Sequence, residues 1–382
     1  MRILNIWNFF QPELKYHVHF LSECFTAEGH EVFFISTDKS NKTWSPFLKN
    51  KKFKAGKEIY PYATVYRLKC FEIFNKQIPL NWIKYYRLIK AIQPDVVHIL
   101  GIGNFLSWIC IFLLKIYNKK VIIVANDHSN PNEAKEGFVA KNYKKFNQLL
   151  FTVYGHYYKC IICPNLSSKK FIQNLYEVDE ARMKIIPLGY DDVTFYYDPA
   201  LKNSERDKLI VSFAGKIEPR KKIEELLYAV SEMKNKLNVI VRIAGISNTV
   251  HREYFNSLQK IGETYSLNVE YLPLQQPNDL RKFYNFSDIA VFPGSISITT
   301  VEANACGIPI ILFQSIEGLE DRVENGRGTL FTKRRELVNC LEDFYLKKID
   351  GKIYNTEIES VTRDYSWKKL SKQYIQVYES FK

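Results

Sequence analysis

A short segment between residues 289 and 312 holds residue types that can bind a phosphate and a ribose. The apolar run Ile289–Phe292 predicts a buried strand. Thr299 or Thr300 can cap a helix that follows this strand, which places Glu302 in the first helical turn. The amides of such a turn favour a phosphate, and a carboxylate one turn in can accept hydrogen bonds from two ribose hydroxyls. The segment therefore predicts a nucleotide-binding loop, with an ordinary strand–helix connection as the alternative.

A pair of lysines upstream could bind the same ligand. The run Leu209–Ala214 predicts another buried strand, and Lys216 and Lys221 lie between it and an amphipathic helix that starts near Ile223. Each ammonium group that reaches a partly dry diphosphate would contribute about 1.5–3 kcal/mol. The alternative is a solvated basic turn. A binding site is favoured because both loops follow strands, and open α/β sheets bind ligands at the carboxyl ends of their strands.

Strands and helices are expected to alternate along the whole chain, which is the pattern of a doubly wound α/β fold. In the first half, strands are expected near residues 2–7, 31–36, 65–68, 96–100, 121–124, 160–163 and 184–187, and helices near residues 16–26, 81–92, 105–117, 139–158 and 167–176. After the polar stretch 191–207, strands are expected near residues 209, 239, 269, 289, 308 and 329. With 382 residues, the chain is long enough for two domains.

The seven cysteines favour a reducing compartment. Their number is odd and they are scattered, unlike the cysteines of an extracellular disulfide framework. Cys160 and Cys163 have the spacing of a zinc or redox pair, but the second pair that a structural zinc would need is missing, so no metal site is expected. No signal peptide is evident, and the longest apolar run, residues 99–114, is shorter than the roughly 20 residues that span a bilayer. We therefore expect a cytoplasmic protein, soluble or peripheral on the inner face of the cell membrane.

The excess positive charge is confined to the first half of the chain. Residues 1–190 contain 27 lysines and arginines against 14 aspartates and glutamates, whereas residues 191–382 contain 27 of each kind. This favours an anionic partner such as a membrane surface, where each basic residue adds about 1 kcal/mol. Residues 44–57 and 141–151 combine cations with aromatic side chains, as membrane-binding segments do, and a solvated helix face is the alternative for the second segment. No nucleic-acid-binding motif accompanies the charge.

Several short motifs, in their order along the chain, resemble those of the family 4 glycosyltransferases. The matching segments are Arg2–Trp7, Pro12, Glu28–Val32, Pro94–His98, Ile186–Asp191 with Phe195, Gly215-Lys216 with Pro219–Lys221, Ala244-Gly245, Phe283–Ile289 and Tyr365–Trp367. The resemblance implies the GT-B fold, in which two doubly wound Rossmann-like domains face a cleft. It also implies that the C-terminal helix crosses back to the first domain.

By this resemblance the chain has an acceptor-binding domain and a donor-binding domain. Residues 1–190, with the crossover helix 365–382, would form the first domain, residues 191–208 the linker, and residues 209–364 the domain that binds a nucleotide sugar.

The implied activity is that of a retaining glycosyltransferase of the hexosyltransferase type. It would move a sugar from a nucleoside-diphosphate sugar to a glycan or lipid-linked acceptor, in the synthesis of a bacterial surface polysaccharide. No cofactor or metal is expected, since no Asp-x-Asp triplet occurs in the chain and lysines take the place of a divalent ion.

The resemblance also assigns roles to individual residues. Lys216 and Lys221 would stabilise the departing diphosphate, which is the main catalytic task. The donor would be bound by Gly215, Arg220, Gly294, Ser297, Ile298, Thr299, Thr300 and Glu302. Asp127 and His128, which end a predicted strand, could hydrogen-bond the transferred sugar or the acceptor hydroxyl, with a solvated or capping histidine as the alternative.

Three positions depart from the family pattern. The family carries two glutamates separated by seven residues in the donor loop, and Gly294 stands where the first would be. Lys216 replaces an arginine, which keeps the charge but loses the planar fork. The two glycines that usually follow the first strand are absent from residues 11–16. A non-catalytic nucleotide-sugar-binding or scaffold protein and a GT-B nucleotide-sugar epimerase therefore remain as alternatives.

Overall fold

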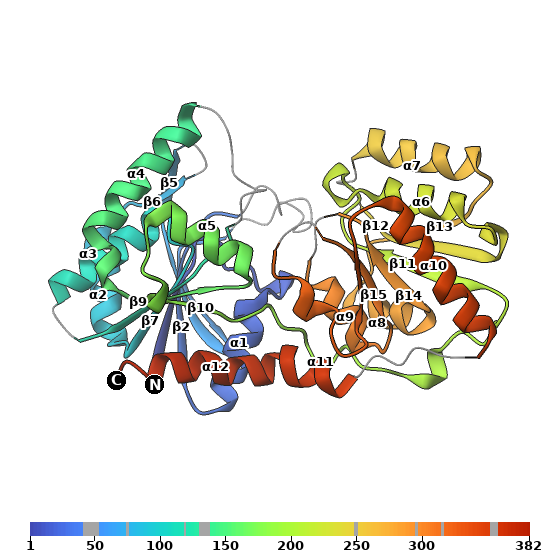
Figure 1. Cartoon of the computed structure of the whole chain (residues 1–382). Helices are drawn as coiled ribbons and strands as arrows, with labels where there is room; N and C mark the ends of the chain where they lie inside the picture. Colours follow the sequence, from blue (N-terminus) through green and yellow to red (C-terminus); the bar gives the residue numbers. More distant parts are fainter. Residues whose placement is uncertain are drawn as a thin grey trace. The chain divides into compact units, whose positions relative to one another are not determined.

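The computed structural model describes residues 1–40, 53–73, 76–117, 120–129, 138–247, 251–294, 297–314, 317–351 and 358–382. The chain divides into two units (Figure 1). Unit 1 comprises Met1–Leu188 together with Leu370–Lys382, and unit 2 comprises Gly189–Lys369. Each unit is built on a largely or wholly parallel β-sheet, as a Rossmann-like α/β fold requires.

The sheet of unit 1 has the strand order β10-β9-β8-β7-β1-β2-β4-β3. Its strands are β1 (Arg2–Ile6), β2 (Glu31–Thr37), β3 (Gly56–Tyr60), β4 (Ala63–Leu68), β7 (Val96–Leu100), β8 (Ile122–Asn126), β9 (Tyr158–Cys163) and β10 (Met183–Ile185). All neighbours pair in parallel except β3 and β4. The central strands consist largely of branched apolar residues because helices cover both faces of the sheet.

The helices of unit 1 are α1 (His17–Ala27), α2 (Trp82–Ile92), α3 (Phe105–Tyr117), α4 (Phe138–Tyr154), α5 (Leu166–Tyr176) and most of α12 (Trp367–Glu379). A two-stranded sheet, β5 (Cys70–Ile73) with β6 (Lys76–Pro79), precedes α2. Helix α12 belongs to this unit because Tyr374 accepts a hydrogen bond from Asn126 at 2.9 Å and Tyr378 pairs with His98 at 2.9 Å. The expected return of the C-terminal helix to the first domain is confirmed.

Unit 2 contains a six-stranded parallel sheet in the order β13-β12-β11-β14-β15-β16. Its strands are β11 (Leu209–Ala214), β12 (Val239–Ile246), β13 (Asn268–Pro273), β14 (Ile289–Phe292), β15 (Ile310–Phe313) and β16 (Gly328–Phe331). Its helices are α6 (Ile223–Glu232), α7 (Arg252–Thr264), α8 (Pro277–Phe286), α9 (Thr299–Ala305), α10 (Arg334–Ile349) and α11 (Ile358–Tyr365). Side chains from both faces of β11 and β14 form its core.

The structure differs from the expected elements in two places. Strands β3, β5 and β6 were not anticipated, since their pairing is antiparallel and their burial is partial. Helix α4 ends at Tyr154, before its expected end at residue 158. A turn of 3-10 helix, Gly155–Tyr157, follows it, and the missing side chain of Gly155 leaves room for the Phe151 ring.

The segments that enter and leave unit 2 are bonded to each other. The amide of Tyr190 donates to the carbonyl oxygen of Tyr365 at 2.9 Å, and the amide of Trp367 donates back to Tyr190 at 3.2 Å. The Tyr190 hydroxyl also pairs with Thr362 at 3.0 Å. Both crossings of the chain are therefore held at one point of unit 2, next to Asp191.

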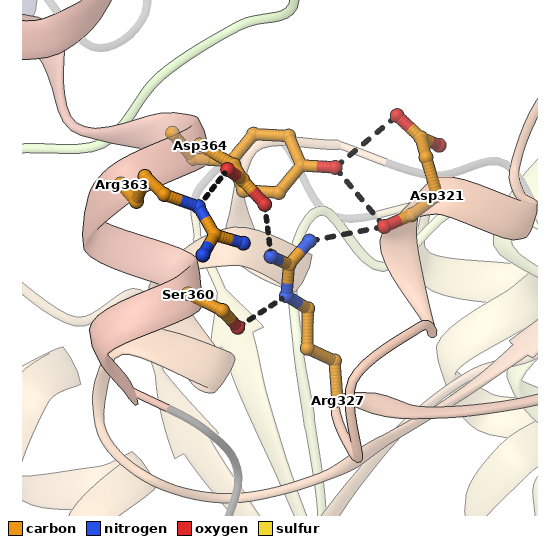
Figure 2. A network of polar contacts seen from close by, with 6 residues as sticks. Asp321, Arg327, Ser360, Arg363 and Asp364 are labelled. Atoms are coloured by element: carbon orange, nitrogen blue, oxygen red, sulfur yellow. Dashed lines mark hydrogen bonds and ion pairs between the residues drawn. The ribbon is translucent and has the colours of Figure 1, made fainter.

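A buried arginine anchors the helix that carries the returning chain (Figure 2). Arg327 is 2% exposed, and its guanidinium donates to the Asp364 carboxylate and to Ser360 in α11. It also donates to the carbonyl oxygen of Asp321 at 3.0 Å and lies 5.1 Å from the ring centre of Tyr365. The buried cation thus joins the segment 321–327 to helix α11, which is more than thirty residues away in sequence.

Replacing Arg327 with methionine should destabilise unit 2. The change keeps most of the side-chain volume but removes a buried donor from Ser360, the Asp364 carboxylate and the Asp321 carbonyl, so we expect the free energy of unfolding to fall by about 2–4 kcal/mol. Urea unfolding measures this quantity directly.

Arg363 provides a matched control, because its Nε lies 3.0 Å from the same Asp364 carboxylate but its side chain is 68% exposed. Burial by itself raises the pKa of Asp364, but hydrogen bonds from Arg363 and Arg327 outweigh it and lower the pKa. Arg363→Met should cost less than about 1 kcal/mol. Equal losses in the two variants would show that burial of Arg327 contributes nothing.

Candidate functional site

The strand order of unit 2 reverses between β11 and β14. From β11 the chain proceeds outward to β12 and β13, and β14 starts the other half of the sheet with β15 and β16. Strands β11 and β14 are parallel neighbours, so the loops that follow them leave the same edge of the sheet. Open α/β sheets bind ligands outside this edge, at the point of reversal.

The loop after β11 brings two lysines to this edge. Lys216 is half-buried and Lys221, at the end of the 3-10 turn Pro219–Lys221, is only 6% exposed. The Lys221 Cε lies 4.0 Å from the place that a Cβ of Gly215 would occupy, so its side chain folds back over Gly215. A Cβ on Gly245 would meet the carbonyl oxygen of Gly215 at 1.8 Å, which fixes the end of β11 against β12.

Arg220 lies in the same turn, but its side chain points elsewhere. It is exposed, and its Nε donates to Glu218 at 2.6 Å. The Arg220 guanidinium and the Glu218 carboxylate therefore lie at the protein surface, whereas Lys221 is buried.

The loop after β14 packs directly on the turn that holds the lysines. A Cβ on Gly294 would lie 2.4 Å from the carbonyl oxygen of Arg220 and 2.5 Å from the carbonyl carbon of Lys221. No Cβ approaches backbone atoms so closely, so the two loops can meet only at a residue without a side chain. This explains in physical terms why a glycine occupies the place of the family's first glutamate.

Helix α9 begins one residue earlier than a threonine cap would require. Its N-terminal cap is Ile298, whose side chain makes no capping hydrogen bond, so the expectation of a cap at Thr299 or Thr300 is wrong. The Thr300 hydroxyl instead donates to the carbonyl oxygen of Ser297 at 3.0 Å, and the hydroxyls of Ser297 and Thr299 lie 2.7 Å apart. The amides of residues 300–302 are bonded within this turn, so they are not free to bind a phosphate as those of an uncapped turn would be.

Glu302 lies in the first turn of α9, as expected, in an environment that disfavours its charge. Burial raises the pKa of this half-buried side chain to about 8, and the nearby Asp191 carboxylate adds to the effect. Asp191 accepts hydrogen bonds from the Val193 amide and the Thr194 hydroxyl. Burial and the Glu302 charge also raise the pKa of the Tyr284 phenol. Among the described residues none donates a hydrogen bond to the Glu302 carboxylate, so a ligand's hydroxyls could supply the donors that its ionised form needs.

Asp127 and His128 lie in unit 1, at the end of β8. Both carboxylate oxygens of Asp127 accept backbone amides, those of Ile102 at 2.9 Å and Ser129 at 2.9 Å. Asp127 thus holds two loops in place. The His128 ring is half-buried, and its Nε2 lies 3.1 Å from the Asn126 side-chain oxygen. His128 is therefore the better placed of the two residues to meet a ligand.

Two further histidines, which we did not anticipate as site residues, surround His128. The rings of His17 and His128 lie 4.6 Å apart. Burial and then the nearby His128 lower the pKa of His98 to about 3, and burial lowers that of His17. Spacing along the chain could not reveal this group, because its members come from α1, β7 and the end of β8. The histidine that ends the Pro94–His98 motif was the one available signal.

The remaining predicted features have these positions. Both cysteines of the Cys160–Cys163 pair are buried in β9, and burial raises the pKa of Cys160 to about 11. In the described parts of the chain, no three His, Cys, Asp or Glu side chains are placed to hold a metal ion. Of the basic segment 44–57, residues 44–52 lie outside the described residues. The segment 141–151 lies in α4.

Two family models match this chain and together span most of it. One, described as Glycosyltransferase Family 4, matches residues 14–193, and the other, described as Glycosyl transferases group 1, matches residues 198–351. The chain belongs to the family 4 glycosyltransferases.

Individual proteins resemble this glycosyltransferase over part or all of its length. An uncharacterized glycosyltransferase of Methanocaldococcus jannaschii is 20% identical over 387 residues, covering 96% of this chain and 94% of that protein. D-inositol 3-phosphate glycosyltransferase of Rhodococcus erythropolis is 28% identical over 191 residues, covering 45% of this chain and 42% of that protein. The Anabaena protein HepE, solved in complex with UDP, has a TM-score of 0.73 at 15% identity, with 100% of both chains covered. The glycosyltransferase therefore has the GT-B fold.

Substituting Gly294 with alanine should strain the two loops that meet at this residue. The new methyl group would force the backbone of Arg220 and Lys221 to move, so we expect a loss of about 1–3 kcal/mol in the free energy of unfolding. Gly262 in α7 is the control, because a Cβ there would meet its nearest neighbour at an ordinary 3.5 Å. Gly262→Ala should be neutral or stabilising by up to about 1 kcal/mol. A stable Gly294→Ala variant would contradict the close packing.

The raised pKa of Glu302 predicts a pH-dependent stability in the absence of ligand. A carboxyl that binds its proton more tightly in the folded chain stabilises the fold fully below its ordinary value of 4.5 and loses that contribution as the pH rises through about 8. The stability of the wild type relative to Glu302→Gln should therefore fall across this range. Urea unfolding at a series of pH values tests it, with Glu253→Gln, an exposed position in α7, as the control. Parallel curves for wild type and Glu302→Gln would refute the prediction.

Proposed function

We propose that this glycosyltransferase transfers a hexosyl group from a nucleoside-diphosphate sugar to a hydroxyl of a glycan or lipid-linked acceptor, with retention at the anomeric carbon. The observation that carries the proposal is the meeting of the lysine turn and the Gly294–Glu302 loop at the strand reversal of unit 2. The proposed role is in the synthesis of a bacterial surface polysaccharide, and the family resemblance supports it.

The two lysines would act on the leaving diphosphate. Negative charge grows on the glycosidic oxygen as the bond to the sugar breaks, and Lys216 and Lys221 supply positive potential at that place. The burial of Lys221 strengthens this effect, because a charge acts more strongly where water is excluded. With two cations at the diphosphate, the proposed reaction needs no divalent metal.

Glu302 would bind the ribose of the donor. An ionised carboxylate can accept hydrogen bonds from both ribose hydroxyls, and these bonds would offset the burial that raises its pKa. The HepE structures in complex with UDP, with UDP and glucose, and with UDP-glucose support a uridine nucleotide as the first donor to test here.

His128 would contact the acceptor hydroxyl or the transferred sugar from unit 1. Its hydrogen bond to Asn126 fixes the ring, and Asp127 holds the neighbouring loops through their amides. We therefore propose a positioning role for Asp127 and a direct contact for His128.

Removing either lysine charge should weaken nucleotide binding. We expect Lys216→Gln and Lys221→Gln each to lower the affinity for UDP by about tenfold or more, as the loss of one charge-assisted contact implies. Calorimetry with UDP and GDP measures the affinity, and incubation with UDP-sugars measures turnover. Lys222→Gln is the control, because Lys222 carries the same charge in the next position but lies 4.6 Å over the Phe313 ring.

Three outcomes would contradict the proposal. Equal effects of all three substitutions would mean that the general positive potential, and not a lysine clamp, binds the nucleotide. An isomerised donor formed without acceptor would identify an epimerase. Tight UDP binding without turnover of any UDP- or GDP-sugar, in the presence of glycan and lipid acceptors, would identify a binding protein.

A further inference from the structure

Unit 1 exposes apolar side chains on one side far more than elsewhere. Of the twenty-one large apolar side chains that the described residues expose, ten lie on β5, α2, α3, α4 and the residue before α2's cap. They are Phe71, Ile73, Leu80, Trp82, Ile83, Phe112, Ile116, Phe146, Leu149 and Val153. We call the outer surface of α2, α3 and α4, with the adjoining β5–β6 sheet, the outer helix face.

The elements of the outer helix face are neighbours in space. Helix α3 contacts α2 on one side and α4 on the other, and β6 also contacts α3, as Figure 1 shows on the left of unit 1. Ring contacts continue across the helix boundaries, between Trp82 and Phe112 at 6.3 Å and between Phe105 and Phe146 at 5.8 Å. The next helix, α5, exposes no large apolar side chain, so the outer helix face ends at α4.

These helices are apolar on their outer side as well as on their inner side. In α2, Tyr85 and Ile89 are fully buried against the sheet, whereas Ile83 is 67% exposed. Helix α4 repeats the pattern, with Leu149 62% exposed and Phe151 buried. A helix that only covers a core presents polar residues to water, so the bare solvated-helix alternative does not account for this face.

The three helices of the outer helix face carry charges of one sign, and the adjoining strand β5 contributes one acidic residue, Glu72. Helices α2, α3 and α4 contain seven lysines and arginines and no aspartate or glutamate. Lys84, Lys115 and Lys145 are exposed among the apolar side chains, and the Lys76 ammonium lies 3.8 Å from the ring centre of Tyr143. Apolar side chains surrounded by cations are complementary to a surface that is anionic outside and apolar beneath.

We propose that the outer helix face binds the surface of an anionic lipid bilayer. The apolar side chains would enter the boundary between headgroups and acyl chains, and the lysines would meet the anionic headgroups. In the described part of the chain no helix has the length and apolar character to cross a bilayer, so binding would be from one side. The proposal rests on the proposed function in one respect only. A lipid-linked acceptor would lie at such a surface, which gives the enzyme a reason to bind it.

Vesicle sedimentation tests the proposal with the full chain and without any donor. We expect binding to vesicles of equal parts phosphatidylglycerol and phosphatidylcholine, little binding to pure phosphatidylcholine, and a decrease with added salt. The triple variant Ile83→Gln, Ile116→Gln, Leu149→Gln should bind more than about tenfold more weakly. The triple variant Lys84→Gln, Lys115→Gln, Lys145→Gln should lose about fivefold per charge.

Matched controls come from unit 2. Leu237, Leu346 and Ile349 are 78%, 57% and 49% exposed, close to the 67%, 54% and 62% of Ile83, Ile116 and Leu149. Their triple glutamine variant should bind vesicles like the wild type, as should Lys234→Gln, Lys260→Gln, Lys282→Gln, which removes three exposed charges from unit 2. Unfolding curves confirm that every variant is folded.

Three results would overturn the proposal. They are no binding to the anionic vesicles, equal binding to neutral vesicles, and equal losses in the unit 1 and unit 2 variants. Failure of the proposed function is distinguishable, because vesicle binding needs no donor. Transfer to a soluble acceptor without vesicle binding would contradict this proposal alone. Vesicle binding without transfer from any nucleotide sugar would contradict the proposed function alone.

Discussion

The close approach of backbone at the strand reversal of unit 2 is the constraint on which the candidate site depends. Gly294 packs on the carbonyl groups of Arg220 and Lys221, and Gly245 packs on that of Gly215. These contacts leave no room for a Cβ and set the distance between the lysine turn and the Glu302 loop. A glutamate could not be placed at position 294 without moving the lysines. The close packing of the two loops therefore excludes the family's first glutamate from this chain.

The same packing explains the unusual electrostatics of the site. Where the two loops meet, Lys221 is buried and Glu302 is half-buried, and these ionisable groups have opposite signs. Burial of the Glu302 carboxyl, together with the negative charge of the neighbouring Asp191, raises the pKa of Glu302. A ligand with a phosphate and adjacent hydroxyls would supply the missing partners. Without a ligand, the buried ionisable groups therefore lower the stability of the fold at this site. Functional sites often carry such a cost.

Sequence reasoning recovers the parts of this structure that local pattern determines. The buried strands of both sheets, most helix limits and the place of Glu302 follow from apolar periodicity and turn residues. The β5–β6 pair and the end of α4 were missed, because partial burial weakens the pattern and because the fit of Phe151 over Gly155 is a contact in space. The grouping of His17, His98 and His128 was missed for the same reason. The steric role of Gly294 also needed coordinates, since the pattern showed only which residue was absent.

On the outer helix face, sequence patterns predict more burial than the structure shows. A helix in the outer layer of a doubly wound sheet needs one apolar stripe, and α2, α3 and α4 each satisfy that need with residues that pack on the sheet. Apolar residues beyond that stripe raise the mean hydropathy without aiding the fold, and from the sequence they look like additional core. Only the position of each side chain separates Ile89, which is buried, from Ile83, which is not. Exposed apolar groups cost solubility and give the fold nothing in return, and the proposed contact with an anionic bilayer would cover those of these three adjacent helices.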